Sequence, residues 1–232
     1  MNWVDLGLFF EQTEYVEFYT NVPMIIAMIG CLILGYFLGG INTGIIVSKI
    51  VYHDDIRNYG SKNAGMTNML RTYGKKMAAI TLLGDILKAV IAIFAARLIL
   101  GTWGAYIAGL GCVIGHVFPC YFGFKGGKGV ATVAAMVLCT NPFLFLILFA
   151  VFAILVIGYK FVSLGSVMCM MLYPVFISRL GSHMEKHIIP IFCVFAVAVL
   201  VIVKHKDNIK RLLAGTEYKI SFKKKKEETE EK

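Results

Sequence analysis

Residues 143–158 read FLFLILFAVFAILVIG and contain no polar side chain. A run of this composition is typical of a helix in a lipid bilayer, which needs about 20 mainly apolar residues to cross. The whole 232-residue chain has the same character, because 58% of its residues are apolar, only 16% are charged and its mean hydropathy is +0.74. These values exclude a water-soluble domain, a disordered chain and a disulfide-stapled secreted fold.

Other apolar runs lie on both sides of this one. Polar residues, glycine or proline separate seven segments: 24–47, 77–99, 104–121, 129–140, 143–158, 162–178 and 188–203. The shortest, 129–140, would reach only about 18 Å and needs a turn at Thr140, Asn141 and Pro142. If 129–158 were instead one kinked helix, the number of spans would change from odd to even. We expect an all-α integral membrane protein, built as a seven-span helical bundle.

The distribution of charge predicts the orientation of the bundle. The first 23 residues carry only acidic charges, whereas 48–76 holds six basic residues and the C-terminal tail is rich in lysine. Cytoplasmic loops are enriched in Lys and Arg, so the N-terminus is expected outside and the C-terminus in the cytoplasm, which requires an odd number of spans. This places 48–76, 120–129, 159–162 and 204–232 on the cytoplasmic face. The same rule explains the net charge of +9 without nucleic acid.

The chain divides into three parts on these grounds. Residues 1–23 form an acidic extracytoplasmic segment, 24–217 a seven-span domain, and 218–232 a charged cytoplasmic tail that we expect to be disordered. The six cysteines lie singly, with no C-x-x-C pair, so we expect neither a metal site nor a disulfide framework.

Two features inside the spans have structural interpretations. Glycines four residues apart predict helices that approach closely, at Gly35 with Gly39, Gly40 with Gly44, and Gly111 with Gly115. Asp85 and Lys88 lie inside the second apolar run, where ionisable residues are expensive. Being three apart on a helix they can form an ion pair, so a structural role is at least as well supported as a catalytic one.

Three polar blocks lie in the segments assigned to the cytoplasm. The first, residues 55–71, is dense in Gly, Ser, Asn and Thr and ends in Arg71, which provides hydroxyl and amide donors and then a cation. These are the components of a phosphate site, although a polar loop that only turns the chain fits the composition equally well.

The second block, residues 115–132, interleaves three glycines with two lysines immediately before a predicted helix. Backbone amides, positive charge and a helix N-terminus at one place favour anion binding. The block is not a nucleotide-binding P-loop, because Gly129 stands where that motif has Ser or Thr.

The third block opens the last cytoplasmic segment. If the final span continues as a helix past the membrane surface, His205, Asn208 and Arg211 share one stripe, and Glu217 follows. A His, an amide and an Arg on one stripe favour a site over an isolated interfacial histidine. Ser163, at the start of the sixth span, fits either a site or a helix cap.

Together, G-S-x-N-x-G-x-T-N-x-x-R at 60–71 and G-H-x-F-P…F-K-G-G-K-G-V-A-T at 115–132 resemble the bacterial membrane glycerol-3-phosphate acyltransferase family that uses acyl phosphate. The resemblance covers about residues 24–217. It implies a seven-span bundle with a cytoplasmic active site in the cell membrane of a bacterium. The chain departs from the family pattern at Asn42, Lys62 and Met66.

The resemblance also assigns roles to residues. It implies a catalytic set of Ser61, Arg71, Lys128, His205 and Asn208. It implies a substrate-binding set of Asn63, Gly65, Thr67, Asn68, Lys125, Gly126, Gly127, Gly129, Ser163, Arg211 and Glu217. No cofactor or metal is expected. The expected partners are acyl phosphate, glycerol 3-phosphate, membrane lipids and, by functional coupling, an enzyme that forms acyl phosphate.

The residue types fit this chemistry, because acyl phosphate and glycerol 3-phosphate are both anions that need cations and amides around them. No G-x-S-x-G elbow is present, and no histidine has an aspartate five residues later, so we expect direct attack without a covalent intermediate. A substrate phosphate is favoured over His205 as the proton acceptor.

Two other function classes remain open from sequence. An organic-anion transporter or channel would use the basic glycine-rich loops to bind cargo, although it would place them near the midplane within an internal repeat. A lipid-binding scaffold is supported only by the four lysines at 223–226, which four glutamates follow closely.

Overall fold

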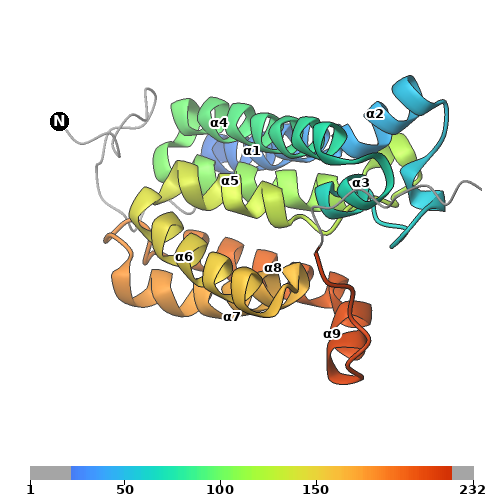
Figure 1. Cartoon of the computed structure of the whole chain (residues 1–232). Helices are drawn as coiled ribbons and strands as arrows, with labels where there is room; N and C mark the ends of the chain where they lie inside the picture. The colour runs from blue at the N-terminus through green and yellow to red at the C-terminus, as the bar shows by residue number, and fades with distance from the viewer. Residues whose placement is uncertain (1–21, 221–232) are drawn as a thin grey trace, which may run out of the picture.

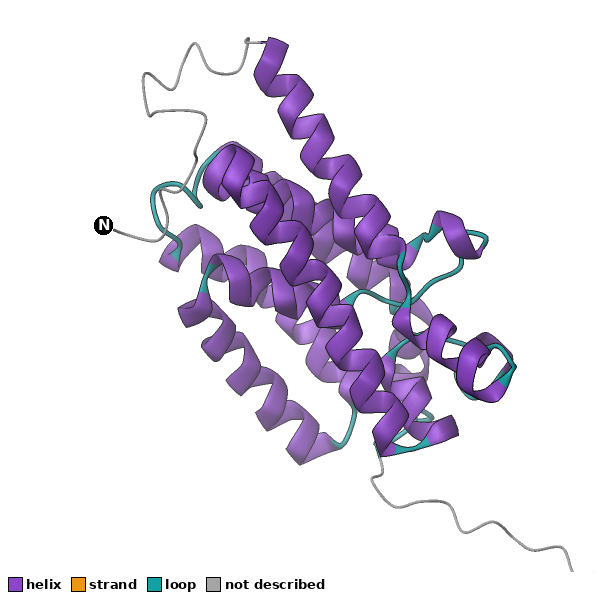
Figure 2. Ribbon diagram, turned by 90° about the horizontal axis from the view of Figure 1, so that it is seen from above, coloured by secondary structure: helices purple, strands orange, loops and turns teal. Residues whose placement is uncertain are grey.

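The computed structural model describes residues 22–220 and is all-helical, with no strand in that range (Figure 1, Figure 2). The N-terminal part holds α1 (Val22–Gly40), α2 (Thr43–Tyr52), α3 (Met66–Tyr73) and α4 (Lys75–Val117). It is followed by α5 (Val130–Thr140), α6 (Pro142–Tyr159), α7 (Val162–Leu180), α8 (Ile188–Lys204) and α9 (Lys206–Leu213). Two short 3₁₀ helices, η2 (Ile56–Asn58) and η3 (Cys120–Phe122), lie in the connections. The predicted all-α class is confirmed.

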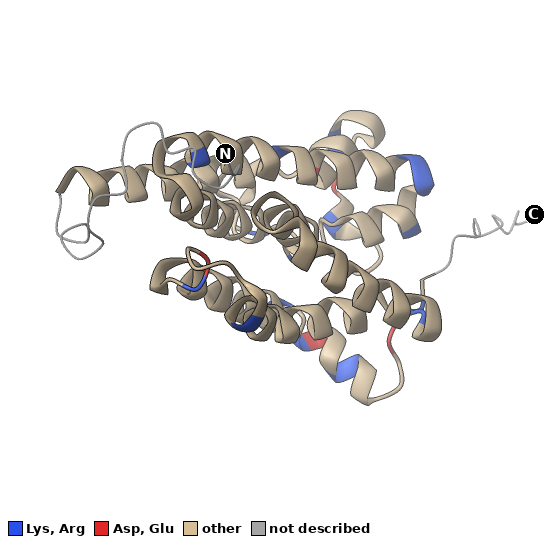
Figure 3. Cartoon of the chain, turned by 90° about the vertical axis from the view of Figure 1, so that its left-hand side faces the viewer, with Lys and Arg blue, Asp and Glu red and all other residues tan. Residues whose placement is uncertain are grey.

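Four helical segments in the described chain are long and apolar enough to cross a membrane: Val22–Tyr52, Lys75–Phe122, Pro142–Tyr159 and Val162–Leu180. A fifth is added if α8 and α9, which meet at 57°, are counted as one span. Helix α5 has only 11 residues, and Asn141 caps α6 next to it, with Pro142 at the first position of α6. Most of the helical ribbon carries no charged residue (Figure 3).

Helix α4 consists of two antiparallel arms. Leu100 and Gly101 have non-helical backbone angles, and Gly101 has φ of 55°, a region that glycine adopts without strain. Lys88 Nζ lies 2.9 Å from His116 Nδ1, although 28 residues of straight helix would separate them by about 42 Å. The predicted runs 77–99 and 104–121 are therefore separate arms, the second of which ends at Val117, just before Pro119.

The predicted segment 24–47 lies within one apolar span, Val22–Tyr52, which is interrupted where the chain leaves the helical path between α1 and α2. Asn42 is extended, and its side-chain oxygen accepts a hydrogen bond from the backbone N–H of Ile45 at 3.4 Å, which caps α2. The break leaves the Ile41 carbonyl outside the helix, where Lys88 Nζ donates to it at 2.8 Å. A residue from another helix thus stabilises the interruption.

Helix α1 packs against the second arm of α4 through glycines, as predicted for Gly35 with Gly39 and for Gly111 with Gly115, whereas Gly40 and Gly44 lie on either side of the break after α1. A Cβ atom at Gly35 would overlap the carbonyl oxygen of Ala108, and one at Gly39 would overlap that of Cys112. The contact is reciprocal, because Gly111 and Gly115 meet the backbone of α1. The two helices approach at backbone distance, which gives close dispersion contact without large side chains.

The polar segments gather at one end of the bundle, which we call the loop end; it comprises residues 53–74, 118–129, 160–161 and 205–220. Figure 1 shows α2, α3 and α9 there. Arg57 donates to the Phe122 carbonyl at 2.8 Å, and the Ile220 N–H donates to the Lys160 carbonyl at 2.8 Å. Four segments far apart in sequence therefore meet in space.

We predict that Gly39→Ala destabilises the bundle, because the added methyl group would force α1 away from Cys112. Overpacking of this kind costs about 1–3 kcal/mol, which corresponds to a fall in melting temperature of about 5 °C. The measurement is thermal unfolding of the detergent-solubilised protein. Gly30→Ala is the matched control, since nothing lies within 4 Å of a Cβ there. Equal melting temperatures for both variants would contradict close packing of α1 against Cys112.

Candidate active site

The carboxylate of Glu217 is the centre of a buried polar group at the loop end. Its Oε1 accepts hydrogen bonds from Ser163 Oγ at 2.9 Å and from Asn208 Nδ2 at 2.7 Å. Its Oε2 accepts from Arg211 Nε at 2.8 Å, an ion pair. Lys128 donates in turn to Asn208 Oδ1. We call these five residues the Glu217 cluster; all five were predicted as site residues.

Local chain geometry brings Glu217 back over α9. After Leu213 the chain turns at Gly215, which has φ of 69°, and the N–H of Thr216 donates to the Arg211 carbonyl at 2.8 Å. A left-handed glycine after a helix is a common way to reverse the chain. Ser163 lies in the first turn of α7, and Lys128 lies just before α5. The cluster therefore joins residues from three helix ends.

Positive charge exceeds negative charge around this carboxylate. Arg71, on α3, donates to the Tyr218 carbonyl at 3.4 Å, and its guanidinium lies 5.0 Å from the centre of the Tyr218 ring. The guanidinium of Arg211 lies 5.5 Å from the same ring. Arg211 thus pairs directly with the buried carboxylate of Glu217, and Arg71 and Lys128 lie close enough to interact with it electrostatically. The surplus charge suits a polyanionic ligand.

Electrostatics show how closely these charges interact. Burial lowers the pKa of Lys128 to about 8; the Glu217 carboxylate opposes this shift, while the nearby Arg211 and Arg71 add to it. Burial also lowers the pKa of Arg71, with Glu217 acting in the opposite direction. Lys128 therefore loses its proton at a lower pH than an ordinary lysine does. A bound anion would stabilise the charged form.

The last span does not continue as one straight helix through His205, so the condition for a single stripe of His205, Asn208 and Arg211 is not met. Helix α8 ends at Lys204, and α9 leaves at 57°. His205 sits at the bend with its Nδ1 2.7 Å from the Val201 carbonyl oxygen, which can only accept a hydrogen bond, so Nδ1 carries the proton. The ring is buried, and the charges of Lys128 and Glu217 lie close enough to interact with it electrostatically. Its Nε2 is left as the basic nitrogen.

The first polar block forms a loop held from within by Asn68. The Asn68 side chain accepts from the Ser61 N–H at 2.9 Å and donates to the carbonyls of Ile56, Tyr59 and Asn63. Asn68 is buried and shapes the loop, and its predicted role in substrate binding stays a prediction. Among the described residues, no hydrogen bond or ion pair joins the other predicted residues of this loop to the Glu217 cluster: Ser61, Asn63, Gly65 and Thr67.

The second polar block uses its glycines for packing as well as for shape. The N–H groups of Gly126 and Gly127 donate to the carbonyls of Val117 and His116 at 3.2 and 3.1 Å. These two amides are therefore engaged, contrary to the expectation that they would be offered to an anion. Gly129 has φ of 83° and immediately precedes α5, so the loop points Lys128 toward α9.

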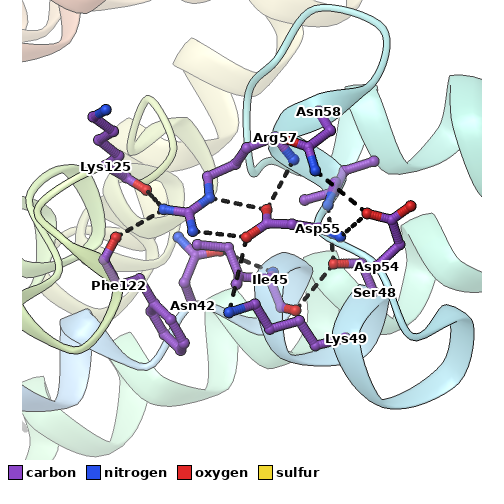
Figure 4. Close-up of polar contacts among 11 residues, drawn as sticks. Asn42, Ile45, Ser48, Lys49, Asp54, Asp55, Arg57, Asn58, Phe122 and Lys125 are labelled. Carbon is purple, nitrogen blue, oxygen red and sulfur yellow. Dashed lines mark hydrogen bonds and ion pairs between the residues drawn. The ribbon is translucent and has the colours of Figure 1, made fainter.

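Lys125 and Lys128 have different positions, and Arg57 fixes the backbone at the first of them. Arg57 pairs with both carboxylate oxygens of Asp55, at 2.9 and 2.7 Å, and donates to the carbonyls of Phe122 and Lys125, at 2.8 Å each (Figure 4). The hydrogen bonds that Arg57 donates to Asp55 lower the pKa of that carboxyl group. In Figure 4 the Lys125 side chain points away from these contacts. Lys128, not Lys125, is the lysine in the Glu217 cluster.

Sequence reasoning missed two residues of this region. Tyr218 is the ring between two guanidinium groups, and its only signal was its place after Glu217. Arg57 connects the first two blocks, and its signal was the opposite charge two residues earlier at Asp55. Within residues 22–220, no three His, Cys, Asp or Glu side chains come together as metal ligands.

Comparison with known proteins gives the same family throughout. The family model described as "Glycerol-3-phosphate acyltransferase" matches residues 29–215. A protein of that name from Clostridioides difficile is 45% identical over 198 residues, which cover 83% of this chain and 95% of the relative. Another from Alkaliphilus metalliredigens is 41% identical over 192 residues, with the same coverage.

Solved structures agree with the sequence relatives. The crystal structure of PlsY (YgiH), "an integral membrane glycerol 3-phosphate acyltransferase", in its glycerol 3-phosphate form, superposes with a TM-score of 0.78 at 34% identity. The match covers 84% of this chain and 96% of that one. The lysophosphatidic acid form gives a TM-score of 0.75 at 32% identity. The chain therefore belongs to the glycerol-3-phosphate acyltransferase family and is a multi-pass membrane enzyme.

Proposed function

We propose that the protein transfers the acyl group of acyl phosphate to the sn-1 hydroxyl of glycerol 3-phosphate. The products are 1-acylglycerol 3-phosphate, which is lysophosphatidic acid, and inorganic phosphate, in the first step of phospholipid synthesis. The observation that carries the proposal is the grouping of three cations around the Glu217 carboxylate: Arg211 pairs with it, Lys128 binds Asn208 beside it, and Arg71 contacts the neighbouring Tyr218. Family membership favours this enzyme over the transporter that the sequence left open.

The surplus charge addresses the main difficulty of the reaction. Two substrates with phosphate groups repel each other, so holding them together requires cations fixed in advance. Arg71 and Arg211 lie against one tyrosine ring, and Lys128 is held by Asn208, so none of the three needs large reorganisation when the substrates bind. The donor supplies its own leaving group, and the protein supplies position and charge.

The proposed step is a direct acyl transfer. The sn-1 oxygen forms a bond to the acyl carbonyl carbon, and the bond from that carbon to the phosphate oxygen breaks with its electron pair leaving on phosphate. The hydroxyl proton passes to a substrate phosphate oxygen. His205 contacts the Val201 carbonyl through Nδ1 and serves to position substrate in this scheme. Ser163 is already bonded to Glu217, so we assign it to the binding site and not to a covalent intermediate.

The proposed membrane topology follows from the distribution of basic residues and from the position of the loop end. We place residues 24–217 in the cell membrane of a bacterium as a seven-span catalytic domain, with the N-terminus outside and the C-terminus in the cytoplasm. The loop end then faces the cytoplasm, where glycerol 3-phosphate and an enzyme that forms acyl phosphate would meet it. The assigned segments 1–23 and 218–232 lie almost wholly outside the described residues.

We predict that Arg71→Ala and Lys128→Ala each lower kcat/KM by about thirtyfold or more, because each variant leaves a bound substrate phosphate without one of its cations, and losing one partner of such a charge pair costs about 2–5 kcal/mol. The assay is release of inorganic phosphate from palmitoyl phosphate and glycerol 3-phosphate by the purified protein. Arg179→Ala, an exposed cation at the other end of α7, is the control and should keep full activity. Activity that survives both substitutions together would defeat the proposal.

Alkaline pH should weaken catalysis through Lys128. Its pKa is lowered to about 8, chiefly by burial, so the free enzyme has the charged lysine below this pH and loses it above. We predict that kcat/KM falls as pH rises through about 8, since kcat/KM reports groups of the free enzyme. Lys128→Arg keeps its charge at these pH values and should not show the fall. A flat wild-type profile to pH 9.5 would contradict this assignment.

A further inference from the structure

A second buried ionic group lies inside the bundle, separate from the Glu217 cluster. Asp85, Lys88 and His116 are 2%, 6% and 3% exposed, and all belong to the two arms of α4. Lys88 Nζ lies 2.9 Å from Asp85 Oδ1, which confirms the predicted ion pair, and 2.9 Å from His116 Nδ1. It also donates to the Ile41 carbonyl at 2.8 Å. We call these three side chains the α4 triad.

The contacts of Lys88 determine the protonation of His116. An ammonium group has three N–H donors and no acceptor, and here its three neighbours are a carboxylate, a carbonyl and an imidazole nitrogen. The Nδ1 atom of His116 must therefore accept. The proton of the neutral ring is then on Nε2, at the edge that faces away from Lys88.

That far edge of the ring supports the glycine loop. A Cβ atom at Gly127 would overlap His116 Nε2, so the ring lies directly against the backbone of this glycine. The carbonyls of His116 and Val117 accept the N–H groups of Gly127 and Gly126. The next residue is Lys128, whose ammonium reaches the Glu217 cluster.

We propose that the α4 triad is a positioning unit for phosphate binding: Asp85 and Lys88 fix the His116 ring, and the ring fixes the loop 126–129 and with it Lys128. The inference rests on the proposed function only in treating Lys128 as a phosphate ligand. It gives a positioning role to three residues, none of which contacts the Glu217 cluster directly in the described structure.

The free-energy cost of burying the charges of the α4 triad supports a role for the triad beyond stability. Burying an ion pair is expensive, and well-packed apolar side chains of similar volume often stabilise a protein as well or better. Outside α4, the triad contacts the helix break at Ile41 and the glycine loop. Both border the loop end, as expected of a group that sets the geometry of the site.

The first test removes the charges of the triad together, so that no unpaired buried charge remains. In Asp85→Asn/Lys88→Met, the Kd for glycerol 3-phosphate, measured by isothermal titration in detergent, should rise about tenfold. The melting temperature should stay close to wild type, and kcat at saturating substrate should change less than about threefold. Arg97→Met is the matched control, because Arg97 is also in α4 but bonds to the Cys139 carbonyl at the other end.

The second test makes the side chain at position 127 larger and the side chain at position 116 smaller, first singly and then together. Gly127→Ala should weaken glycerol 3-phosphate binding about tenfold, and His116→Asn should do likewise, because its Oδ1 can still accept from Lys88 but its far edge is missing. In the double variant the new methyl group occupies the space of the ring edge. Binding should therefore return to within about threefold of wild type.

The outcomes separate the inference from the proposed function. Weaker binding in Asp85→Asn/Lys88→Met with an unchanged melting temperature supports the positioning role, and binding within twofold of wild type overturns it. If that variant does not fold, the exchange decides: recovery in the double variant supports the role, and the product of the two single losses overturns it. A wild-type protein that binds glycerol 3-phosphate but releases no phosphate from acyl phosphate would defeat only the proposed function.

Discussion

The hydrogen bonds of the Glu217 carboxylate hold the loop end in one arrangement. A buried carboxylate is costly unless it is paired and fully hydrogen-bonded, and Glu217 obtains its donors from Ser163, Asn208 and Arg211. Through Asn208 it also fixes Lys128. One acid therefore ties α7, α9 and the chain before α5 together. Because it neutralises only part of the positive charge that surrounds it, the same interaction leaves cations available to a ligand.

The membrane-spanning bundle makes this arrangement possible. Backbone groups inside a bilayer must be satisfied within the helices, so irregular chain and most charges are displaced to the ends. Close packing of α1 on α4, with Gly35 against Ala108 and Gly39 against Cys112, then fixes how the helices emerge. A site built on the ends of tightly packed helices keeps its geometry better than one built on long free loops.

Much of the fold could be predicted from the sequence because its physical cause is local. Apolar runs, the turn at Leu100–Gly101 between the arms of α4 and the Asn141 start of α6 all follow from side-chain type. The break after Ile41 could not be predicted in this way, because Lys88, 47 residues away, stabilises it. The bend at His205 likewise depends on what α9 meets after it leaves α8.

The site shows the same division. The residue types of the Glu217 cluster were recognisable from their motifs, as were Arg71 and His205. The engagement of the Gly126 and Gly127 amides could not be foreseen, since their acceptors lie at the end of the preceding helix arm and depend on the loop folding back. The sequence does not distinguish Arg57 from the other basic loop residues, because its position between Asp55 and the second block depends on how the two loops fold together.

If the cations around Glu217 bind substrate phosphate, a bound substrate must lie against them. The most direct measurement is an experimental structure of this protein in lipid or detergent with glycerol 3-phosphate bound. We expect the phosphate oxygens to lie within hydrogen-bond distance of Arg71 and Lys128, with Glu217 still bonded to Asn208. A phosphate bound away from both cations, for example at Lys125 alone, would contradict it.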